Sequence, residues 1–118
     1  MNREVKFYRT EAGHCPVEEF LDSLDGKQAQ KVAWVLRLVE ELESIPARYF
    51  KKLAGTDDIW EARIDSGHDT FRLLGFFDGR HIVVLTHGFQ KKSQKTPQQG
   101  ISLAQERRKD YFRRKKHE

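Results

Sequence analysis

The chain has 118 residues, of which 37% are hydrophobic, so it can form one compact core but not two. No apolar run is long enough to cross a bilayer, and the charged first residues lack the apolar stretch of a signal peptide. With Cys15 as the single cysteine, no internal disulfide can form. These features predict one domain over residues 1–118, located in the cytoplasm and not in a membrane.

Positive charge is concentrated in the second half of the chain. The net charge is +4, but residues 61–118 contain 13 Lys and Arg against 7 Asp and Glu, whereas residues 1–60 contain 9 against 11. A basic half of this kind is expected to attract a polyanion, and nucleic acid is the usual one. A solvated basic surface without a partner has the same composition, so charge alone leaves both interpretations open.

The first half of the chain predicts a strand and two helices. Residues 5–8 alternate apolar and polar side chains, which is typical of a short strand. Pro16 suits the first turn of a helix that continues to Leu24, where Asp25-Gly26 breaks it. A longer helix is predicted from Lys27 to Glu43, ended by Pro46, and the two helices should share an apolar face. Three- and four-residue spacing defines the stripe on the longer helix: Val32, Val35, Leu36, Val39 and Leu42.

The second half predicts three strands and a final helix. After Gly55 the periodicity changes to two, and Asp78-Gly79 is a strong hairpin signal. The last strand has the most continuous apolar run, which predicts an interior place in the sheet. The expected strands are Ile59–Ile64, Thr70–Phe77 and Arg80–His87. A basic loop over 90–97 follows them. The last element is a helix over Gln98–Arg114, whose expected core contacts are Ile101, Ala104 and Tyr111.

The predicted element order is therefore β-α-α-β-β-β-α. It indicates an α+β fold in which a small, mostly antiparallel sheet packs on a helical hairpin, with a C-terminal helix added. Trp34 and Trp60 are predicted to be core residues rather than platforms for stacked bases.

Polar residues gather on the predicted sheet. Side chains two apart on a strand share a face, so Glu61 and Arg63 point one way while Trp60, Ala62 and Ile64 point into the core. Arg72 lies inside an apolar strand and needs an acidic partner or a groove, and Glu61 across the hairpin is a candidate partner. A histidine and three lysines follow at the end of the last strand: His87, Lys91, Lys92 and Lys95.

This set contains the groups that RNA cleavage by the neighbouring 2′-hydroxyl requires. A base removes the 2′ proton, an acid protonates the leaving 5′ oxygen, and cations stabilise the phosphorane. The sequence shows no acidic cluster and no closely spaced Cys/His set, so no metal ligands are predicted. Structural alternatives stay open: an ion pair of Glu61 with Arg63 or Arg72, a hydrogen-bonded strand end at His87, and a solvated lysine loop.

Three segments together resemble the RelE/ParE toxin superfamily, and in particular its HigB-like, phage-derived branch. The most specific part is Phe89 followed by Lys91-Lys92 and then Lys95-Thr96-Pro97, and Ala104, Arg108 and Tyr111 on the last helix agree with it. The segments are Trp60–Ile64, Phe71–Leu74 and Val84–Pro97. The resemblance covers nearly the whole chain and implies a toxin of a type II toxin–antitoxin pair that cuts mRNA in the ribosomal A site.

The resemblance also implies roles for particular residues. Glu61, Arg63, Arg72, His87 and Lys92 are expected to be catalytic, without a cofactor or metal. The residues expected to bind RNA are Lys91, Lys92, Lys95 and Arg108. This chain departs from the RelE pattern, in which the positions of Glu61 and Arg63 are both basic.

The expected partners are mRNA on the ribosome and a cognate helix-turn-helix antitoxin that covers the basic groove. Two alternatives share the fold. A ParE-like toxin inhibits DNA gyrase and cuts no RNA, and a degenerate toxin keeps only antitoxin binding.

Overall fold

Five strands form a single mixed sheet in the computed structural model, which describes residues 2–92 and 95–117. The spatial order is β1-β5-β4-β3-β2; β1 runs parallel to β5, and the other neighbours are antiparallel. The strands are β1 (Glu4–Phe7), β2 (Phe50–Lys52), β3 (Trp60–Ser66), β4 (Asp69–Asp78) and β5 (Ile82–Gln90). The predicted α+β class is confirmed, and β5 has a neighbour on both sides, as its apolar run predicts.

Two tight hairpins connect the three long strands. Gly67 and Gly79 occupy them with φ values of 63° and 71°, a backbone conformation that glycine adopts without steric cost. The predicted turn at Asp78-Gly79 is thereby confirmed. The three strands form one continuous antiparallel surface, on which residues from β3, β4 and β5 lie in fixed register.

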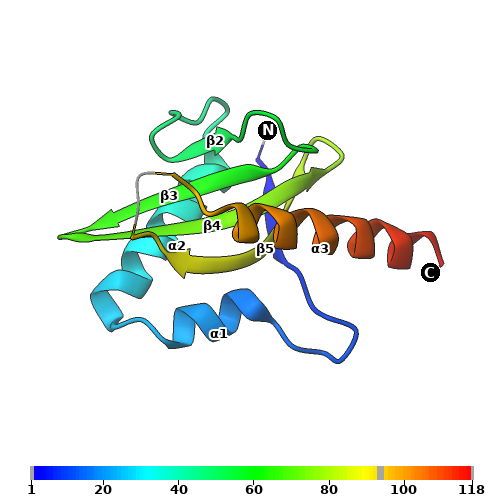
Figure 1. Cartoon of the computed structure of the whole chain (residues 1–118). Coiled ribbons are helices and arrows are strands. Elements are labelled where there is room, and N and C mark those ends of the chain that lie inside the picture. The colour runs from blue at the N-terminus through cyan, green and yellow to red at the C-terminus, as the bar shows by residue number, and fades with distance from the viewer. Residues whose placement is uncertain (1, 93–94, 118) are drawn as a thin grey trace.

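The three helices are α1 (Pro16–Asp22), α2 (Gly26–Glu41) and α3 (Gln98–Lys116). Pro16 stands in the first turn of α1, and Asp25 begins α2 with a capping box in which its side chain and that of Gln28 exchange hydrogen bonds with backbone N–H groups. Figure 1 shows α3 in front of the sheet and α2 behind it. Among the described residues, no helix is both long and apolar enough to traverse a bilayer.

The sheet separates two apolar clusters. The larger one lies between the sheet and helices α1 and α2, and includes Val17, Val32, Val35, Val39, Ala62, Ile64 and Leu73. The smaller one lies under α3 and contains Tyr8, Ile59, Leu74, Phe76, Val84 and Ala104, with Ile101 and Tyr111 packed against it. The predicted stripe on α2 is confirmed except at Leu42, which is exposed because the helix ends at Glu41.

Two local features differ from the sequence prediction. The structure adds strand β2, whose Lys51 lies directly opposite Glu61 of β3. Trp34 is 42% exposed, so its assignment to the core was wrong: it falls outside the buried stripe of α2 and instead contacts Tyr49, with Lys31 above its ring. Trp60 does join the larger core, where it stacks on Phe50 with ring centroids 5.0 Å apart.

Candidate active site

Register places two arginines and a glutamate on one face of the sheet. Arg63 on β3 lies directly opposite Arg72 on β4, and Glu61 lies opposite Leu74. Directly opposed residues of an antiparallel pair project from the same face. Leu74 belongs to the cluster under α3, so Glu61, Arg63 and Arg72 also occupy the α3 face, whereas Ala62 and Ile64 occupy the other. The predicted division of β3 into a polar and a core face is confirmed.

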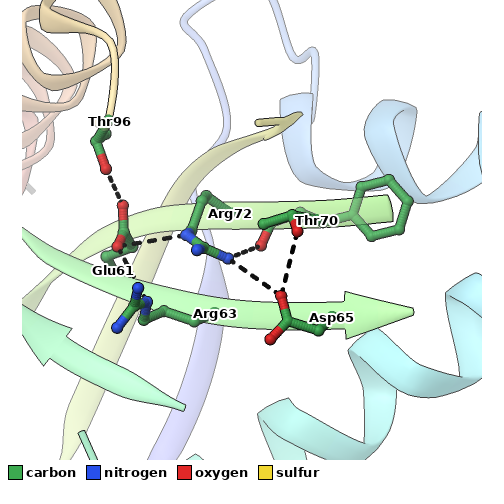
Figure 2. Close-up of polar contacts among 7 residues, drawn as sticks. Glu61, Arg63, Asp65, Thr70, Arg72 and Thr96 are labelled. Atoms are coloured by element: carbon green, nitrogen blue, oxygen red, sulfur yellow. Dashed lines mark hydrogen bonds and ion pairs between the residues drawn. The ribbon is translucent and has the colours of Figure 1, made fainter. Parts of the chain in front are cut away.

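The three side chains form an ion-pair cluster, here called the Glu61 cluster (Glu61, Arg63 and Arg72). The Oε1 atom of Glu61 lies 3.4 Å from Nε of Arg72 and 3.6 Å from Nε of Arg63 (Figure 2). Glu61 and Arg72 are 3% and 5% exposed, while the side chain of Arg63 is one-third exposed. The sequence left open whether Glu61 pairs with Arg63 or with Arg72, and the structure contains both ion pairs. Arg63 is the member of the cluster that faces solvent.

Arg72 is held in place from two further directions. Its Nη1 donates a hydrogen bond of 2.9 Å to the carbonyl oxygen of Phe71 and lies 4.0 Å from Oδ1 of Asp65. That Asp65 oxygen in turn accepts a hydrogen bond from Thr70 (Figure 2). Burial lowers the pKa of the Arg72 guanidinium and Glu61 opposes this shift. Among residues 2–92 and 95–117, the buried Nε of Arg72 has no hydrogen-bond partner, although it lies within ion-pair distance of Glu61.

Thr96, which lies between β5 and α3, contacts the cluster. The hydroxyl of Thr96 donates a short hydrogen bond to Oε2 of Glu61 (Figure 2). Both carboxylate oxygens of Glu61 therefore have partners, one from the arginines and one from this segment. Thr96 and Asp65 are members of the site that sequence reasoning missed, because neither stands out by charge pattern within its segment.

Lys91 is the lysine that the structure places beside the Glu61 cluster. Its backbone N–H donates to the carbonyl oxygen of Thr70 at 2.7 Å. Desolvation lowers the pKa of its ammonium group, with a further lowering from Arg72, while Glu61 acts in the opposite direction. Lys92 and Lys95 are exposed on the following loop, of which residues 93 and 94 lie outside the described residues. Lys91 is therefore linked electrostatically to the Glu61 cluster.

His87 reaches the α3 face because of a β-bulge. The β4–β5 register shifts between Leu74 and Gly75, so that Leu74 faces His87 while Gly75 faces Leu85 and Thr86 is the extra residue. Without the bulge, strict alternation would turn His87 to the other face. Leu74 now stands between Glu61 and His87 in one row across three strands, a separation of roughly 10 Å. The structure does not bring His87 into the Glu61 cluster.

The surroundings of His87 keep its imidazole neutral. Its Nδ1 lies 2.9 Å from the hydroxyl of Thr86, and its ring stacks on Phe89. The first turn of α3 covers it, since a Cβ on Gly100 would lie 3.6 Å from Nε2. Desolvation, followed by the charge of Arg107, lowers the pKa of His87 to about 4. At neutral pH this group therefore carries no proton that it can give as an imidazolium.

Replacing His87 by glutamine is expected to flatten the dependence of stability on pH. The unfolded histidine titrates near 6.5 and the folded one near 4, so stability is complete above pH 6.5 and falls as the pH drops toward 4. This one group accounts for up to about 3 kcal/mol of that loss. Urea denaturation of both proteins between pH 7.5 and 4.5 measures the effect, and parallel curves for the two proteins would contradict it.

Arg108 and Lys51 are two further cations, and they differ in their position relative to the Glu61 cluster. Arg108 lies over the ring of Phe112, which packs on Phe76, and Phe76 is about 13 Å along β4 from Arg72. The structure therefore does not join Arg108 to the Glu61 cluster. Lys51, in contrast, is exposed and shares the face of Glu61 through the β2–β3 register. It extends the positive charge of Arg63 to the sheet edge, and sequence reasoning missed it because strand β2 was not predicted.

The arrangement combines a buried carboxylate, two arginines and a lysine, with a further lysine at the edge. Such a set can accept a proton and stabilise negative charge on a phosphate at the same time. Within residues 2–92 and 95–117, no group of three or more His, Cys, Asp and Glu residues is close enough to hold a metal ion.

Fold and site together define a small basic α+β domain with an acid–arginine cluster on its sheet. Residues 19–109 match the model of the phage-derived Gp49-like proteins (DUF891). The chain belongs to this family, which confirms the predicted placement among the RelE/HigB-like toxins.

Two relatives are similar over most of their length. Both are called "Probable endoribonuclease HigB1" and come from Mycobacterium tuberculosis, strains CDC 1551 / Oshkosh and ATCC 25618 / H37Rv. Each is 34% identical over 110 residues, which cover 92% of this chain and 84% of the relative. The match therefore includes the Glu61 cluster.

Proposed function

We propose that this HigB-like toxin is an endoribonuclease that cuts mRNA on the ribosome. The observation that carries the proposal is the buried Glu61 carboxylate held between Arg72 and Arg63, with Lys91 beside it. These are the groups that a transesterification at an RNA phosphate needs. The name of the mycobacterial relatives, endoribonuclease, agrees with this chemistry.

In the proposed reaction, Glu61 accepts the proton of a ribose 2′-hydroxyl. The 2′ oxygen attacks the adjacent phosphorus, the bond from phosphorus to the 5′ oxygen breaks, and the products are a 2′,3′-cyclic phosphate and a 5′-hydroxyl. Arg72 and Arg63 stabilise the charge of the phosphorane, and Lys91 protonates the departing 5′ oxygen. The lowered pKa of Lys91 suits it to this step better than the exposed Lys92.

The closed state of the cluster supports dependence on the ribosome. Glu61 and Arg72 are almost fully buried, and Thr96 occupies the carboxylate oxygen that the arginines leave open. A free RNA strand would have to displace Thr96 and order itself in the same step. A strand already fixed in the decoding site needs to lose less entropy, so the ribosome supplies the positioning.

The test is inducible expression in a bacterial host, followed by primer extension on a translated reporter mRNA. Growth arrest with new 5′ ends in the coding region, absent when translation is blocked and absent for Arg72→Ala, is the expected result. Arrest without new RNA ends would instead indicate a gyrase-type toxin, and absence of arrest would indicate a degenerate one.

Lys91→Ala is expected to slow cleavage by tenfold or more, and Lys92→Ala by much less. A charge-assisted hydrogen bond is worth about 1.5–3 kcal/mol, and Lys91 shares the electrostatic environment of Arg72, Glu61 and Arg63. Single-turnover cleavage rates on programmed ribosomes measure both variants, which lose the same charge from neighbouring positions. Equal effects would assign the loop only a general attraction for RNA.

Toxins of this type have a cognate antitoxin, and we propose a helix-turn-helix protein encoded beside this chain, acting with it in the cytoplasm. Its acidic and apolar side chains would neutralise the basic second half of the sequence. Co-expression of the adjacent reading frame tests this: it is expected to restore growth, and continued arrest would contradict it.

A further inference from the structure

A carboxylate beside the β3–β4 turn joins three elements of the fold. Asp69, the first residue of β4, accepts hydrogen bonds from Nε2 of Gln28 at 3.1 Å and from Nε2 of Gln90 at 3.0 Å, one on each oxygen. Gln28 stands in the first turn of α2, and Gln90 is the last residue of β5. These three residues are here called the Asp69 bridge. The bridge ties the end of β5 to β4 and to α2.

The two glutamines of the bridge differ in freedom. The side-chain oxygen of Gln28 accepts a hydrogen bond of 3.1 Å from the N–H of Asp25, within the capping box of α2. This contact fixes which end of the Gln28 amide group faces Asp69. Gln90, in contrast, is exposed, so its amide group is free to turn. Asp69 is therefore held firmly by α2 and in turn holds Gln90.

The Asp69 bridge and the Glu61 cluster lie on opposite faces of the sheet. Asp69 and Phe71 are two apart on β4 and share a face, and Phe71 belongs to the larger apolar core beside α1 and α2. Thr70 and Arg72 alternate with them and face the Glu61 cluster. The bridge side chains thus point away from an RNA phosphate at the cluster, so any effect on the reaction passes through the backbone.

Lys91 is the residue at which the backbone passes from the bridge to the site. Its N–H donates to the carbonyl oxygen of Thr70 at 2.7 Å, so the neighbours of Gln90 and Asp69 in the chain are also bonded to each other. On the site face, the Thr70 hydroxyl donates to Asp65, which lies 4.0 Å from Arg72 (Figure 2). The start of the loop that carries Lys91 is therefore fixed from both faces of the sheet.

We propose that the Asp69 bridge positions Lys91, so that its ammonium group lies where it protonates the departing 5′ oxygen. This inference rests on the proposed function, in which Lys91 is the general acid. Asp69 and Gln90 touch no reacting atom and are positioning residues. A strand end without such a tie frays readily, and a displacement of about 1 Å at a reacting group is enough to slow a reaction strongly.

Asp69→Ala is expected to slow cleavage on programmed ribosomes by about tenfold. Asp69→Asn should keep most of the rate, since its new side-chain oxygen can accept from Gln28 while Gln90 turns its amide group to accept from the new NH₂. Gln90→Ala should match Asp69→Ala, and combining the two should slow cleavage no further. Asp22→Ala, which removes the same group from an exposed position on α1, should leave the rate unchanged.

A substrate with sulfur in place of the 5′ bridging oxygen separates lost positioning from general damage. Its phosphorus–sulfur bond breaks with release of a thiolate, which needs little help from an acid because thiols have a pKa of about 8.5. With this substrate, Asp69→Ala and Lys91→Ala should both cleave within about twofold of the wild type. A persistent tenfold loss for Asp69→Ala would overturn the proposal, as would a rate for Asp69→Asn as low as that of Asp69→Ala.

Hydrogen exchange tests the Asp69 bridge apart from cleavage. In the Glu61→Gln background, which removes the proposed base, the amide proton of Lys91 should exchange about tenfold faster with Asp69→Ala than with Asp22→Ala. Equal exchange would overturn the proposal. Faster exchange combined with a failure of the sulfur substrate to restore Lys91→Ala would also overturn it, and would locate the error in the assignment of Lys91 as the acid.

Discussion

Arg72→Ala is expected to reduce cleavage of ribosome-bound mRNA by about 10²–10³-fold or more. Arg72 supplies the buried cation nearest to Glu61, and its Nε, although 3.4 Å from Glu61, has no hydrogen-bond partner among the described residues. The same change should lower the free energy of unfolding by about 3–5 kcal/mol, because it leaves the buried carboxylate with Arg63 as its remaining cation. Single-turnover kinetics and urea denaturation measure the two effects.

A double variant separates the loss of activity from the loss of stability. Glu61→Gln combined with Arg72→Ala removes both buried charges, so it should recover much of the lost stability and none of the lost activity. Arg80→Ala removes an exposed arginine at the β4–β5 turn and serves as the matched control with no effect expected. If the double variant regained cleavage, neither side chain would be needed for the chemistry, and the roles of both Glu61 and Arg72 would be structural.

Glu61→Gln is expected to lower the rate of the chemical step by about 10²–10⁴-fold while changing RNA affinity little. Glutamine retains an oxygen for the Thr96 hydroxyl but cannot take the 2′ proton. Asp65→Asn is the control, because Asp65 is an exposed carboxylate on the same strand that also lies near Arg72. Equal rates for Glu61→Gln and the wild type, with only a change in stability, would favour a structural ion pair.

The sequence predicted most of the fold because its longer elements have clear periodicity. The stripe of α2 and the turn at Asp78-Gly79 are local signals, and the structure follows both. Strand β2 has three residues, which is too short for an alternation pattern, and the sheet rather than its own sequence stabilises it. Trp34 shows the reverse case, in which a large apolar side chain stays at the surface by contact with Tyr49.

The site was only partly predictable for a related reason. Glu61, Arg63 and Arg72 were placed correctly because strand alternation and hairpin register are local rules. The bulge at Thr86 depends on pairing between strands, so the position of His87 did not follow from sequence. Thr96 contacts Glu61 over a sequence separation of 35 residues, and no local sequence pattern predicts a contact of that range.

The parallel pairing of β1 with β5 also decides when the sheet is completed during synthesis. The first strand of the chain to be made remains unpaired until β5 has been translated, and Tyr8 finds Asp110 only when α3 is nearly complete. Glu61 likewise acquires Thr96 late, and contacts of such long sequence separation form slowly. The Glu61 cluster and its Thr96 contact are therefore assembled late in the synthesis of the chain.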